Sequence, residues 1–510
     1  MLSPGPQIHR AFIFIHRWMG VAFCLLFLLW FSSGIGMMYW DYPLVSNTDR
    51  LAHAQELDAT TIRLSPSDAY GQLGADDQPP IEARLAMFDG RPAYKFGNGA
   101  DQLIVYADKG GMQSEFPPEL TRRIAAAWSG HPANLAREQD NVPIDQWTIS
   151  EEFAALRPLR KYTWPTGEQV YVSTQNGEVV QYTTRGSRVG AYIGPIPHWL
   201  YFTPLRRNGP YWSELVIWAS GLATVLTVIG IAVGLWAYSP KKRFRFRGAP
   251  SALPYTGWKR WHSTLGLIFG VIACTWAFSG MLSMDPFPAW QGEQRNLIRA
   301  RFEKALRGKT LNLQDFDSKP PRVALTEAGS GIVQLELSSF LGNPVYLGWT
   351  ESNQTRIVPI HGPSILAFDL GEIAHALKTA ATPYSISQVR TVTQYEAYYV
   401  DRFRRLPLPV IYAQLSDPLR TGFYIDPRTA RIVQDFNSRS RRNRWLYHGL
   451  HSFDLPFLYK HRPAWDVIVL FLMSGGVLLC ATSLVLAWKV LQRKLGSSIR
   501  TAEKTVPAAP

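Results

Sequence analysis

Cysteine is scarce in this sequence of 510 residues, which contains only three. Cys24, Cys274 and Cys480 all fall within long apolar runs, so the more polar parts of the chain contain no cysteine. A disulfide framework is therefore excluded for those parts. They must be stabilised by hydrophobic cores, and segments of about 170 residues are long enough to form such cores.

Several common catalytic and binding motifs are also missing. The sequence contains no HExxH or CxxC motif, no Ser-His-Asp signature, no phosphate-binding glycine loop and no dinucleotide fingerprint. A zinc site or a nucleotide site of ordinary type is therefore not expected. If the protein carries out redox chemistry, the reductant has to come from a quinol, from a separate cytoplasmic reductase or from another partner, because the sequence has no motif for binding a nucleotide reductant.

Four apolar runs contain no lysine or arginine. They cover about residues 18–40, 213–238, 262–284 and 466–488. Each is long enough to cross a bilayer as a helix, which takes about 20 residues. The first run is too long for the apolar part of a secretion signal, and no cleavage site of small residues precedes Asp41, so we expect a retained anchor. The sequence thus predicts four transmembrane helices.

Basic residues concentrate in the short segments beside these runs. Fourteen of the 53 lysines and arginines lie before the first run, between the second and third, or after the fourth, together with only one of the 39 acidic residues. Short cytoplasmic segments collect basic residues, so both termini and the loop 239–261 are predicted to be cytoplasmic. The rest of the chain is nearly balanced, so the net charge of +14 reflects topology and gives no reason to expect nucleic-acid binding.

The predicted fold class combines membrane α-helices with α+β domains outside the cytoplasm. In chain order we expect a cytoplasmic N-terminus with the first helix (1–40), a first outer domain (41–212), the second helix (213–238), a basic cytoplasmic loop (239–261), the third helix (262–284), a second outer domain (285–465), the fourth helix (466–488) and a cytoplasmic tail (489–510).

The sequence is predicted to contain an internal duplication, with two copies of one structural unit. At an offset of 246, the residues His16, Gly20, Trp30, Ser33 and Gly34 answer to His262, Gly266, Trp276, Ser279 and Gly280. Two hairpin-like stretches, 171–181 and 424–434, match at an offset of 253, whereas 199–201 and 445–447 match at 246. Each unit crosses the membrane twice, so the copies share one orientation and a pseudo-twofold axis along the membrane normal should relate them.

Two histidines occupy equivalent positions in the two units. His16 and His262 lie near the cytoplasmic ends of the first and third helices, where an ionisable side chain is costly and indicates a function. Two imidazoles that face each other across an axis, in an apolar pocket, can be the axial ligands of one haem iron. The plainer alternative is that each histidine only occupies the interfacial zone.

A second group of histidines precedes the second and fourth helices on the outer side. It comprises His198, His448 and His451. In the repeat His198 aligns with Arg444, and His448 lies one helical turn beyond Arg444. We therefore expect a second bis-histidine haem site, with His198 and His448 as the preferred pair and His451 in reserve. Packing or surface roles are the alternative.

Haem propionates need cationic partners, and both sites have candidates nearby. They are Arg17, Lys259 and Arg260 for the cytoplasmic site, and Arg206, Arg207 and Arg444 for the outer site.

With these features the chain resembles the PepSY-associated transmembrane helix family of bacterial inner-membrane proteins. The resemblance rests on the paired H-x3-G helix starts and on the stretch RWLYHGLHSFDLP, and it extends from Arg10 to about Leu495. It implies a multi-pass inner (cytoplasmic) membrane protein with large periplasmic PepSY-like domains and two b haems. It also implies ligation by His16 and His262 on one side, and by His198 with His448 or His451 on the other. Arg444 departs from the repeat where a partner for His198 is expected.

Some members of this family resemble iron-regulated di-haem reductases that act on ferric siderophores. The leading hypothesis is therefore a haem-dependent transmembrane reductase, which lies in membrane lipid and passes electrons from a cytoplasmic or quinol donor to a periplasmic ferric chelate. The alternative is a non-redox, membrane-anchored PepSY binding or regulatory protein in which the histidines only pack. A transporter has less support, because the interiors of the predicted helices carry no charge.

Overall fold

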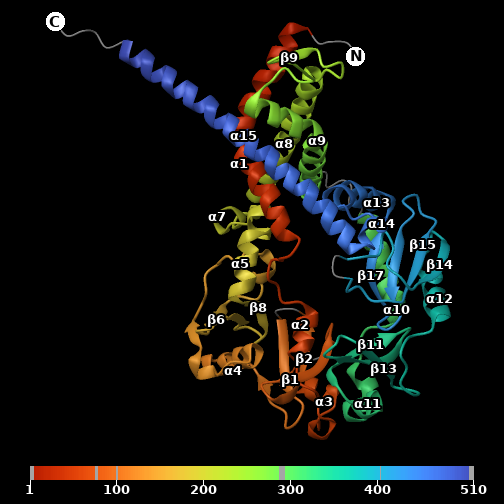
Figure 1. Ribbon diagram of the computed structural model, residues 1–510. Helices are drawn as coiled ribbons and strands as arrows, with labels where there is room; N and C mark the ends of the chain where they lie inside the picture. Colours follow the sequence, from red (N-terminus) through yellow and green to blue (C-terminus); the bar gives the residue numbers. More distant parts are fainter. Residues whose placement is uncertain (1–4, 75–78, 99–100, 287–292, 402–403, 505–510) are drawn as a thin grey trace. The chain divides into compact units, whose positions relative to one another are not determined.

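The chain divides into two units, one helical and one rich in strands (Figure 1). The computed structural model describes residues 5–74, 79–98, 101–286, 293–401 and 404–504. The helical unit comprises Met1–Tyr42, Gly186–Pro288 and Arg442–Pro510, and the sheet unit comprises Pro43–Arg185 and Ala289–Arg441. Membrane helices and α+β regions are thus combined as the sequence predicts.

Four helices of the helical unit are long and apolar enough to cross a membrane. They are α1 (Pro6–Met37), α8 (Gly209–Ala237), α9 (Gly257–Leu282) and α15 (Arg462–Lys504), of which α15 is apolar as far as Lys494. Proline in the first turn of α1 has no backbone N–H that would lack a partner there, and the Asn208 side chain accepts the Tyr211 N–H at the start of α8. The protein is therefore a membrane protein with four apolar helices.

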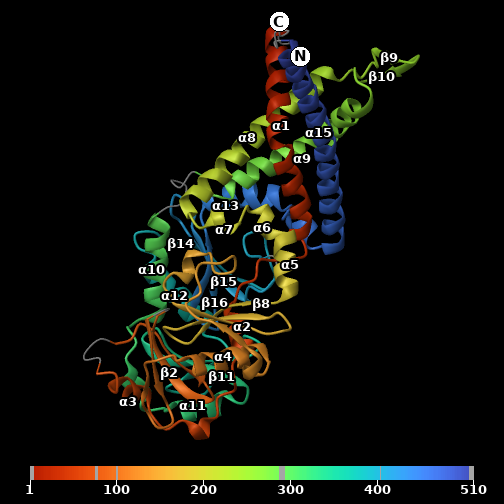
Figure 2. The same cartoon turned by 90° about the vertical axis from the view of Figure 1, so that its left-hand side faces the viewer.

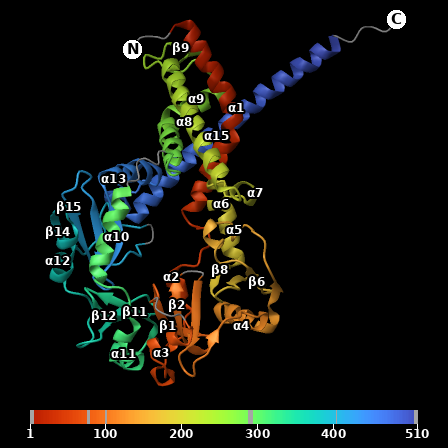
Figure 3. The same ribbon diagram turned by 180° about the vertical axis from the view of Figure 1, so that it is seen from behind.

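These helices form a bundle in which α1 and α9 lie diagonally opposite. α1 packs against α8 and α15, and α9 packs against the same two helices. Figure 2 shows α1 beside α15, and Figure 3 shows α8 beside α9. The interior consists of aromatic and small side chains, namely Phe27, Phe31, Ala223, Leu226, Ala273, Trp276, Ala277 and Cys480. The rings of Phe31 and Trp276 meet across the axis, with centroids 5.7 Å apart.

Short elements lead into the second helix of each half. They are α5 (Arg185–Ile193), α6 (Pro195–His198) and α7 (Thr203–Arg206) before α8, and α13 (Ser438–Arg444), a π-helical turn (Trp445–Gly449) and α14 (Pro456–Tyr459) before α15. α6 packs against α1. Glycine at position 36 permits the close approach of the junction between α5 and α6, because a Cβ there would lie 2.9 Å from the Ile193 carbonyl oxygen. The loop between α8 and α9 contains a small hairpin, β9 (Phe244–Phe246) and β10 (Ala249–Ser251).

A seven-stranded antiparallel sheet joins the two halves of the sheet unit. Its order is β13 (Thr355–Pro359), β12 (Asn343–Thr350), β11 (Ile332–Phe340), β1 (Ala83–Phe88), β2 (Arg91–Asn98), β3 (Asp101–Tyr106) and β4 (Met112–Gln113). β1 pairs with β11, so that Leu85 lies opposite Leu335, and both are fully buried. Two segments that the sequence assigned to separate outer domains therefore share one core.

Short helices cover the apolar face of this sheet. They include α3 (Pro66–Gly71), α11 (Pro321–Ala328) and the 3-10 turns Ala59–Thr61 and Leu313–Phe316, whereas α2 (Asn47–Ala52) lies beside β12 with Asn47 near Arg84. Alternation along β1 turns Leu85 toward this core and Arg84 toward the other face.

Each half adds a four-stranded sheet with helices. The first consists of β5 (Arg137–Gln139), β6 (Leu159–Thr163), β7 (Gln169–Ser173) and β8 (Val179–Thr183), with α4 (Pro118–Ser129) and the 3-10 turns Ala133–Leu135 and Glu151–Phe153. The second consists of β14 (Ile386–Val392), β15 (Val410–Leu415), β16 (Gly422–Asp426) and β17 (Arg431–Phe436), with α10 (Glu293–Arg307) and α12 (Leu370–Ala380).

Both predicted hairpins are confirmed as antiparallel pairs, β7 with β8 and β16 with β17. Their register shifts fall at equivalent places, after Tyr171 and after Tyr424.

The predicted boundaries differ from the observed units at two places. Residues 186–212 and 442–465, expected in the outer domains, belong to the helical unit. Residues 489–504 of the expected tail continue α15, and residues 505–510 lie outside the described part of the chain.

Candidate functional site

His16 and His262 meet in the interior of the bundle. His16 comes from α1 and His262 from α9, and their ring centroids are 6.2 Å apart at an interplanar angle of 37°. Because α1 and α9 lie diagonally opposite, the two rings approach each other across the bundle axis. The structure thus brings together the two histidines that the sequence places at matching positions.

Two hydroxyl groups of α15 hold His262. The Nδ1 atom of His262 lies 3.2 Å from the Thr482 Oγ1 and 3.3 Å from the Ser483 Oγ. Both hydroxyls donate their own protons to the Leu479 carbonyl, at 2.7 and 3.0 Å. The hydroxyl oxygens can therefore only accept from His262, so Nδ1 carries the proton and Nε2 carries the lone pair.

His16 rests against a glycine of α8. A Cβ on Gly230 would lie 2.6 Å from the His16 Cε1 and 3.1 Å from its Nδ1, so no larger residue fits there without displacing the ring. The Nδ1 atom is buried, and among the described residues no hydroxyl lies within hydrogen-bond distance of it; the backbone group near the ring is that of Leu226, which matches Leu479 at an offset of 253.

The second histidine pair is His198 with His451. Their ring centroids are 5.9 Å apart, at 62°. His448, which was the predicted partner of His198, is exposed instead, and its ring lies 4.5 Å from that of Tyr447. The turn Trp445–Gly449, which carries His448 and immediately precedes His451, is a π-turn, and sequence periodicity does not reveal it. The reserve candidate, His451, is the one that meets His198.

Carbonyl and hydroxyl groups at the ends of α1 and α9 hold this pair. His198 Nδ1 lies 3.1 Å from the Trp30 carbonyl oxygen, which can only accept, so Nδ1 carries the proton. His451 Nδ1 lies 3.0 Å from the Ser279 Oγ, whose own proton goes to the Trp276 carbonyl. His451 is therefore also protonated on Nδ1, and both Nε2 atoms carry lone pairs.

The paired Ser-Gly sequences lie directly against the rings of His198 and His451. Ser33 lies 3.3 Å from His198 Nδ1, and a Cβ on Gly34 would lie 3.4 Å from His198 Cε1. A Cβ on Gly280 would lie at the same distance from His451 Cε1. These residues match at an offset of 246, and this recurrence is the signal in the sequence for a role that was not predicted.

The surroundings of His198 and His451 match at an offset of 253. Leu200 and Phe453 both have positive φ, at 53° and 50°. The Trp212 indole donates to the carbonyl of residue 199, at 2.9 Å, and the Trp465 indole donates to the carbonyl of residue 452, at 3.0 Å. The offset of 246, which sets Arg444 opposite His198, does not describe these contacts.

Arg444 is bound within the protein. Its guanidinium donates to the Asp454 carbonyl oxygen at 2.8 Å and to the Asp454 carboxylate at 2.9 Å, and it lies over the Trp445 ring. Its side chain is only 5% exposed. Arg444 therefore closes the loop that carries His448 and His451.

The other predicted cations differ in their surroundings. Arg17 lies beside Phe14 and Trp18, and Arg17, Lys259, Arg260 and Arg207 are exposed. Arg206 lies between the rings of Tyr201 and Trp212.

Burial keeps the second pair neutral. It lowers the pKa of His198 to about 4 and that of His451 to about 3. Both residues lie outside the four apolar spans. A neutral imidazole is the form that binds a metal.

The spacing of both pairs is compatible with two imidazoles that would bind one haem iron. An imidazole nitrogen binds a metal at about 2.0–2.1 Å and lies about 1.2 Å from its ring centre, so two rings in line across one iron have centres about 6.4 Å apart. The observed separations are 6.2 and 5.9 Å. In the described ranges no three His, Cys, Asp or Glu side chains gather around a possible bare ion. A haem, which brings four nitrogens of its own, needs only two protein ligands.

The two pairs are well separated along the bundle. Fourteen residues of α1 separate His16 from Trp30, which corresponds to about 21 Å at 1.5 Å per residue. The aromatic interior around Phe31 and Trp276 lies between them.

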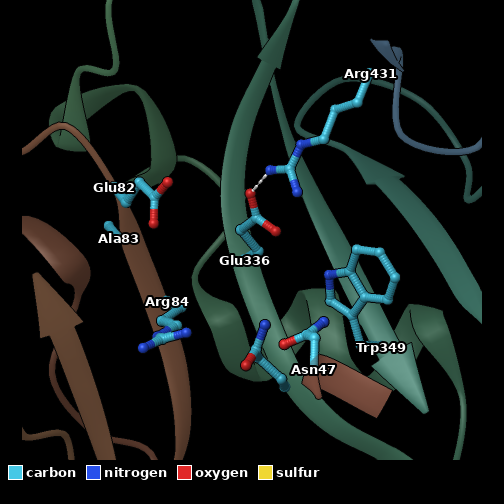
Figure 4. Close-up of a pocket in the computed structure, with 8 residues that line it drawn as sticks. Asn47, Glu82, Ala83, Arg84, Glu336, Trp349 and Arg431 are labelled. Atoms are coloured by element: carbon cyan, nitrogen blue, oxygen red, sulfur yellow. Dashed lines mark hydrogen bonds and ion pairs between the residues drawn. The ribbon is translucent and has the colours of Figure 1, made fainter. Parts of the chain in front are cut away.

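The sheet unit has a pocket of its own, which the sequence analysis did not predict. Its volume is about 240 Å³, and it opens beside the paired strands β1 and β11 (Figure 4). Its lining residues are Asn47, Glu82, Ala83, Arg84, Gln334, Glu336, Trp349 and Arg431. Arg431 bonds to Glu336, and the buried Trp349 Nε1 has no hydrogen-bond partner in the described chain. The lining suits a small polar ligand.

Comparison with known proteins identifies the family. The family model described as PepSY-associated TM region matches residues 14–361, which is more than half of the chain. None of the curated proteins compared with the chain matches it. The chain belongs to the family of proteins with a PepSY-associated transmembrane region.

Proposed function

We propose that this protein is a di-haem electron-transfer protein of the bacterial inner membrane that reduces a periplasmic acceptor, a ferric siderophore or another ferric chelate. The observation that carries this proposal is the pairing of His198 with His451 and of His16 with His262 at the spacing of axial ligands.

The tautomers support the proposal at the second pair. Both Nε2 atoms there carry lone pairs, because both Nδ1 atoms donate to groups at the ends of α1 and α9. An imidazole nitrogen with a lone pair can bind a Lewis acid. Haem iron is a Lewis acid that accepts two imidazoles, and the two rings lie 5.9 Å apart between their centroids.

Haem b supplies reversible one-electron chemistry at its iron when bound. His16 and His262 would hold one haem, and His198 and His451 the other. The protein orients these imidazoles through Thr482, Ser483, Ser33 and Ser279. The interior around Phe31 and Trp276 fills the space between the two sites mainly with apolar side chains.

The charge distribution supports the proposed orientation of the helices in the membrane. The basic loop between α8 and α9 favours a cytoplasmic location for that end of the bundle, which contains the His16–His262 pair. A cytoplasmic or quinol donor would then serve this end, and the acceptor would meet the periplasmic end. The contacts that recur at an offset of 253 support an origin from two copies of one unit in the same orientation.

The pocket of the sheet unit favours a second candidate function. A membrane-anchored binding protein would use the polar groups around Arg84, Trp349 and Arg431 to hold a ligand, without redox chemistry.

An absorption spectrum of the detergent-purified protein separates the two functions. Oxidised and dithionite-reduced spectra, with a pyridine haemochrome assay, should give two b haems per chain, and His262→Gln should lower this toward one. Addition of a ferric chelate to the reduced protein should restore the oxidised spectrum. Colourless protein from haem-sufficient cells would favour the binding protein instead.

A further inference from the structure

The two members of the first histidine pair are held differently. His262 donates to two hydroxyls of α15, whereas His16 faces Gly230 of α8. At the offset of 253, Ile229 and Gly230 stand where Thr482 and Ser483 stand in the other half. The half of the bundle that holds His16 therefore lacks both hydroxyls.

We propose that Thr482 and Ser483 are positioning residues that make His262 the fixed ligand of this site and leave His16 as the exchangeable one. This inference rests on the proposed function, because it assigns different strengths to two proposed haem ligands.

Hydrogen bonding at Nδ1 explains the difference. An imidazole whose Nδ1–H has an acceptor is held in one orientation and tautomer and becomes a stronger ligand through Nε2. His262 has this support from two oxygens. A His16 that binds through Nε2 must carry its proton on a buried Nδ1, which among the described residues has no hydroxyl acceptor and only the backbone of Leu226 nearby.

The space beside His16 does not allow the same support. A Cβ at position 230 would lie 2.6 Å from the His16 ring, so a serine there would collide with the imidazole before its hydroxyl could accept a hydrogen bond. Glycine at position 230 thus explains both the close approach of α8 to His16 and the absence of a hydroxyl there. When His16 dissociates, its position suits a small neutral ligand such as free imidazole.

The second pair provides an internal comparison. His198 and His451 both donate from Nδ1, to Trp30 and Ser279 respectively. Neither of them should be the weaker ligand for lack of a hydrogen bond.

Glycine variants of the four histidines test the inference in the purified full-length protein. His16→Gly should keep two haems, one of them high-spin, and added imidazole should restore the low-spin spectrum. His262→Gly should keep one haem. His198→Gly and His451→Gly serve as matched controls and should resemble each other in haem content. Equal haem loss in the His16 and His262 variants would overturn the inference.

The double variant Thr482→Ile/Ser483→Gly gives α15 the residues that α8 has at these positions. We expect it to transfer haem from the first site to an acceptor protein about 10 to 100 times faster than wild type, with the second haem retained as evidence of folding. The single variant Ser483→Ala, which alters packing less, should show part of this effect. Unchanged transfer rates in both variants would contradict the positioning role, whereas wild-type protein without haem would contradict the proposed function itself.

Discussion

At the scale of single residues, neighbours decide what each histidine can do. The four central histidines differ in what lies beside Nδ1. It is a carbonyl oxygen for His198 and a hydroxyl oxygen for His451 and His262, whereas His16 packs against Gly230. Carbonyl and hydroxyl acceptors leave Nε2 unprotonated. The amino-acid type alone does not determine this property.

Gly230→Ala should displace His16. The added Cβ would lie 2.6 Å from the His16 Cε1, and the neighbour is a ring fixed on α1, so we expect a loss of unfolding free energy of about 1–3 kcal/mol and a high-spin signal from one haem. Thermal unfolding and electron paramagnetic resonance measure these effects. Gly234→Ala is the matched control on the same helix, because its Cβ meets only Leu267 at 3.4 Å. Equal behaviour of the two variants would exclude a close contact between His16 and Gly230.

Glu178 should make the sheet unit sensitive to acid. Burial raises the pKa of this carboxyl, but the cations around it outweigh burial and lower the pKa to about 2. These cations are Lys95, Arg84 and Arg50, with nitrogens 3.2, 2.7 and 2.5 Å from the carboxylate. A lowered folded-state pKa stabilises the fold above the unfolded pKa of about 4.5, and this stabilisation is lost as the pH falls toward 2.

We expect Glu178 to contribute up to about 3 kcal/mol of acid-dependent unfolding free energy. Denaturant unfolding at several pH values measures it, and Glu178→Gln should flatten the dependence between pH 4.5 and 2. Glu119→Gln, at an exposed position of α4, is the control and should leave the dependence unchanged. A wild-type slope in the Glu178 variant would show that other carboxyls cause the acid sensitivity.

At the scale of elements, the segment before α15 shows how a loop positions a candidate ligand. The π-turn Trp445–Gly449 and the buried ion pair of Arg444 with Asp454 hold this segment in place, and His451 follows the turn. Helical periodicity predicts the partner of His198 one turn too early, at His448.

Arg444→Ala should loosen this loop. It leaves the half-buried Asp454 carboxylate without its cation, so the unfolding free energy should fall by about 3 kcal/mol, and the second haem should be lost before the first. Thermal unfolding and haem stoichiometry give the two measurements. Arg442→Ala, at an exposed position of the same helix, should change neither. Retention of both haems at wild-type stability would mean that the Arg444–Asp454 pair does not support His451.

At the scale of the whole molecule, one seven-stranded sheet joins segments that lie on either side of two apolar helices in the sequence. Leu85 and Leu335 face each other where β1 and β11 pair. The sheet core contains residues from both segments, so neither segment contains the whole core.

Leu335→Ala should therefore weaken both segments together. Removal of this fully buried side chain should lower the unfolding free energy of the sheet unit by about 2–5 kcal/mol. Hydrogen exchange should accelerate in β2 and in β12 to the same extent. Leu366→Ala is the control, because Leu366 is exposed. Faster exchange confined to β11–β13 would mean that the two segments unfold independently.

The sequence by itself determined the four apolar helices, the two hairpins around Tyr171 and Tyr424 and the family, and it predicted the pairing of His16 with His262. These features depend on composition and on spacing, which are local or recur at a fixed interval. Only the tertiary structure decided that His198 meets His451, that Ser483 holds His262 and that the two outer segments share a sheet. The physical reason is that these outcomes depend on contacts between distant residues, such as the 221 positions that separate His262 from Ser483.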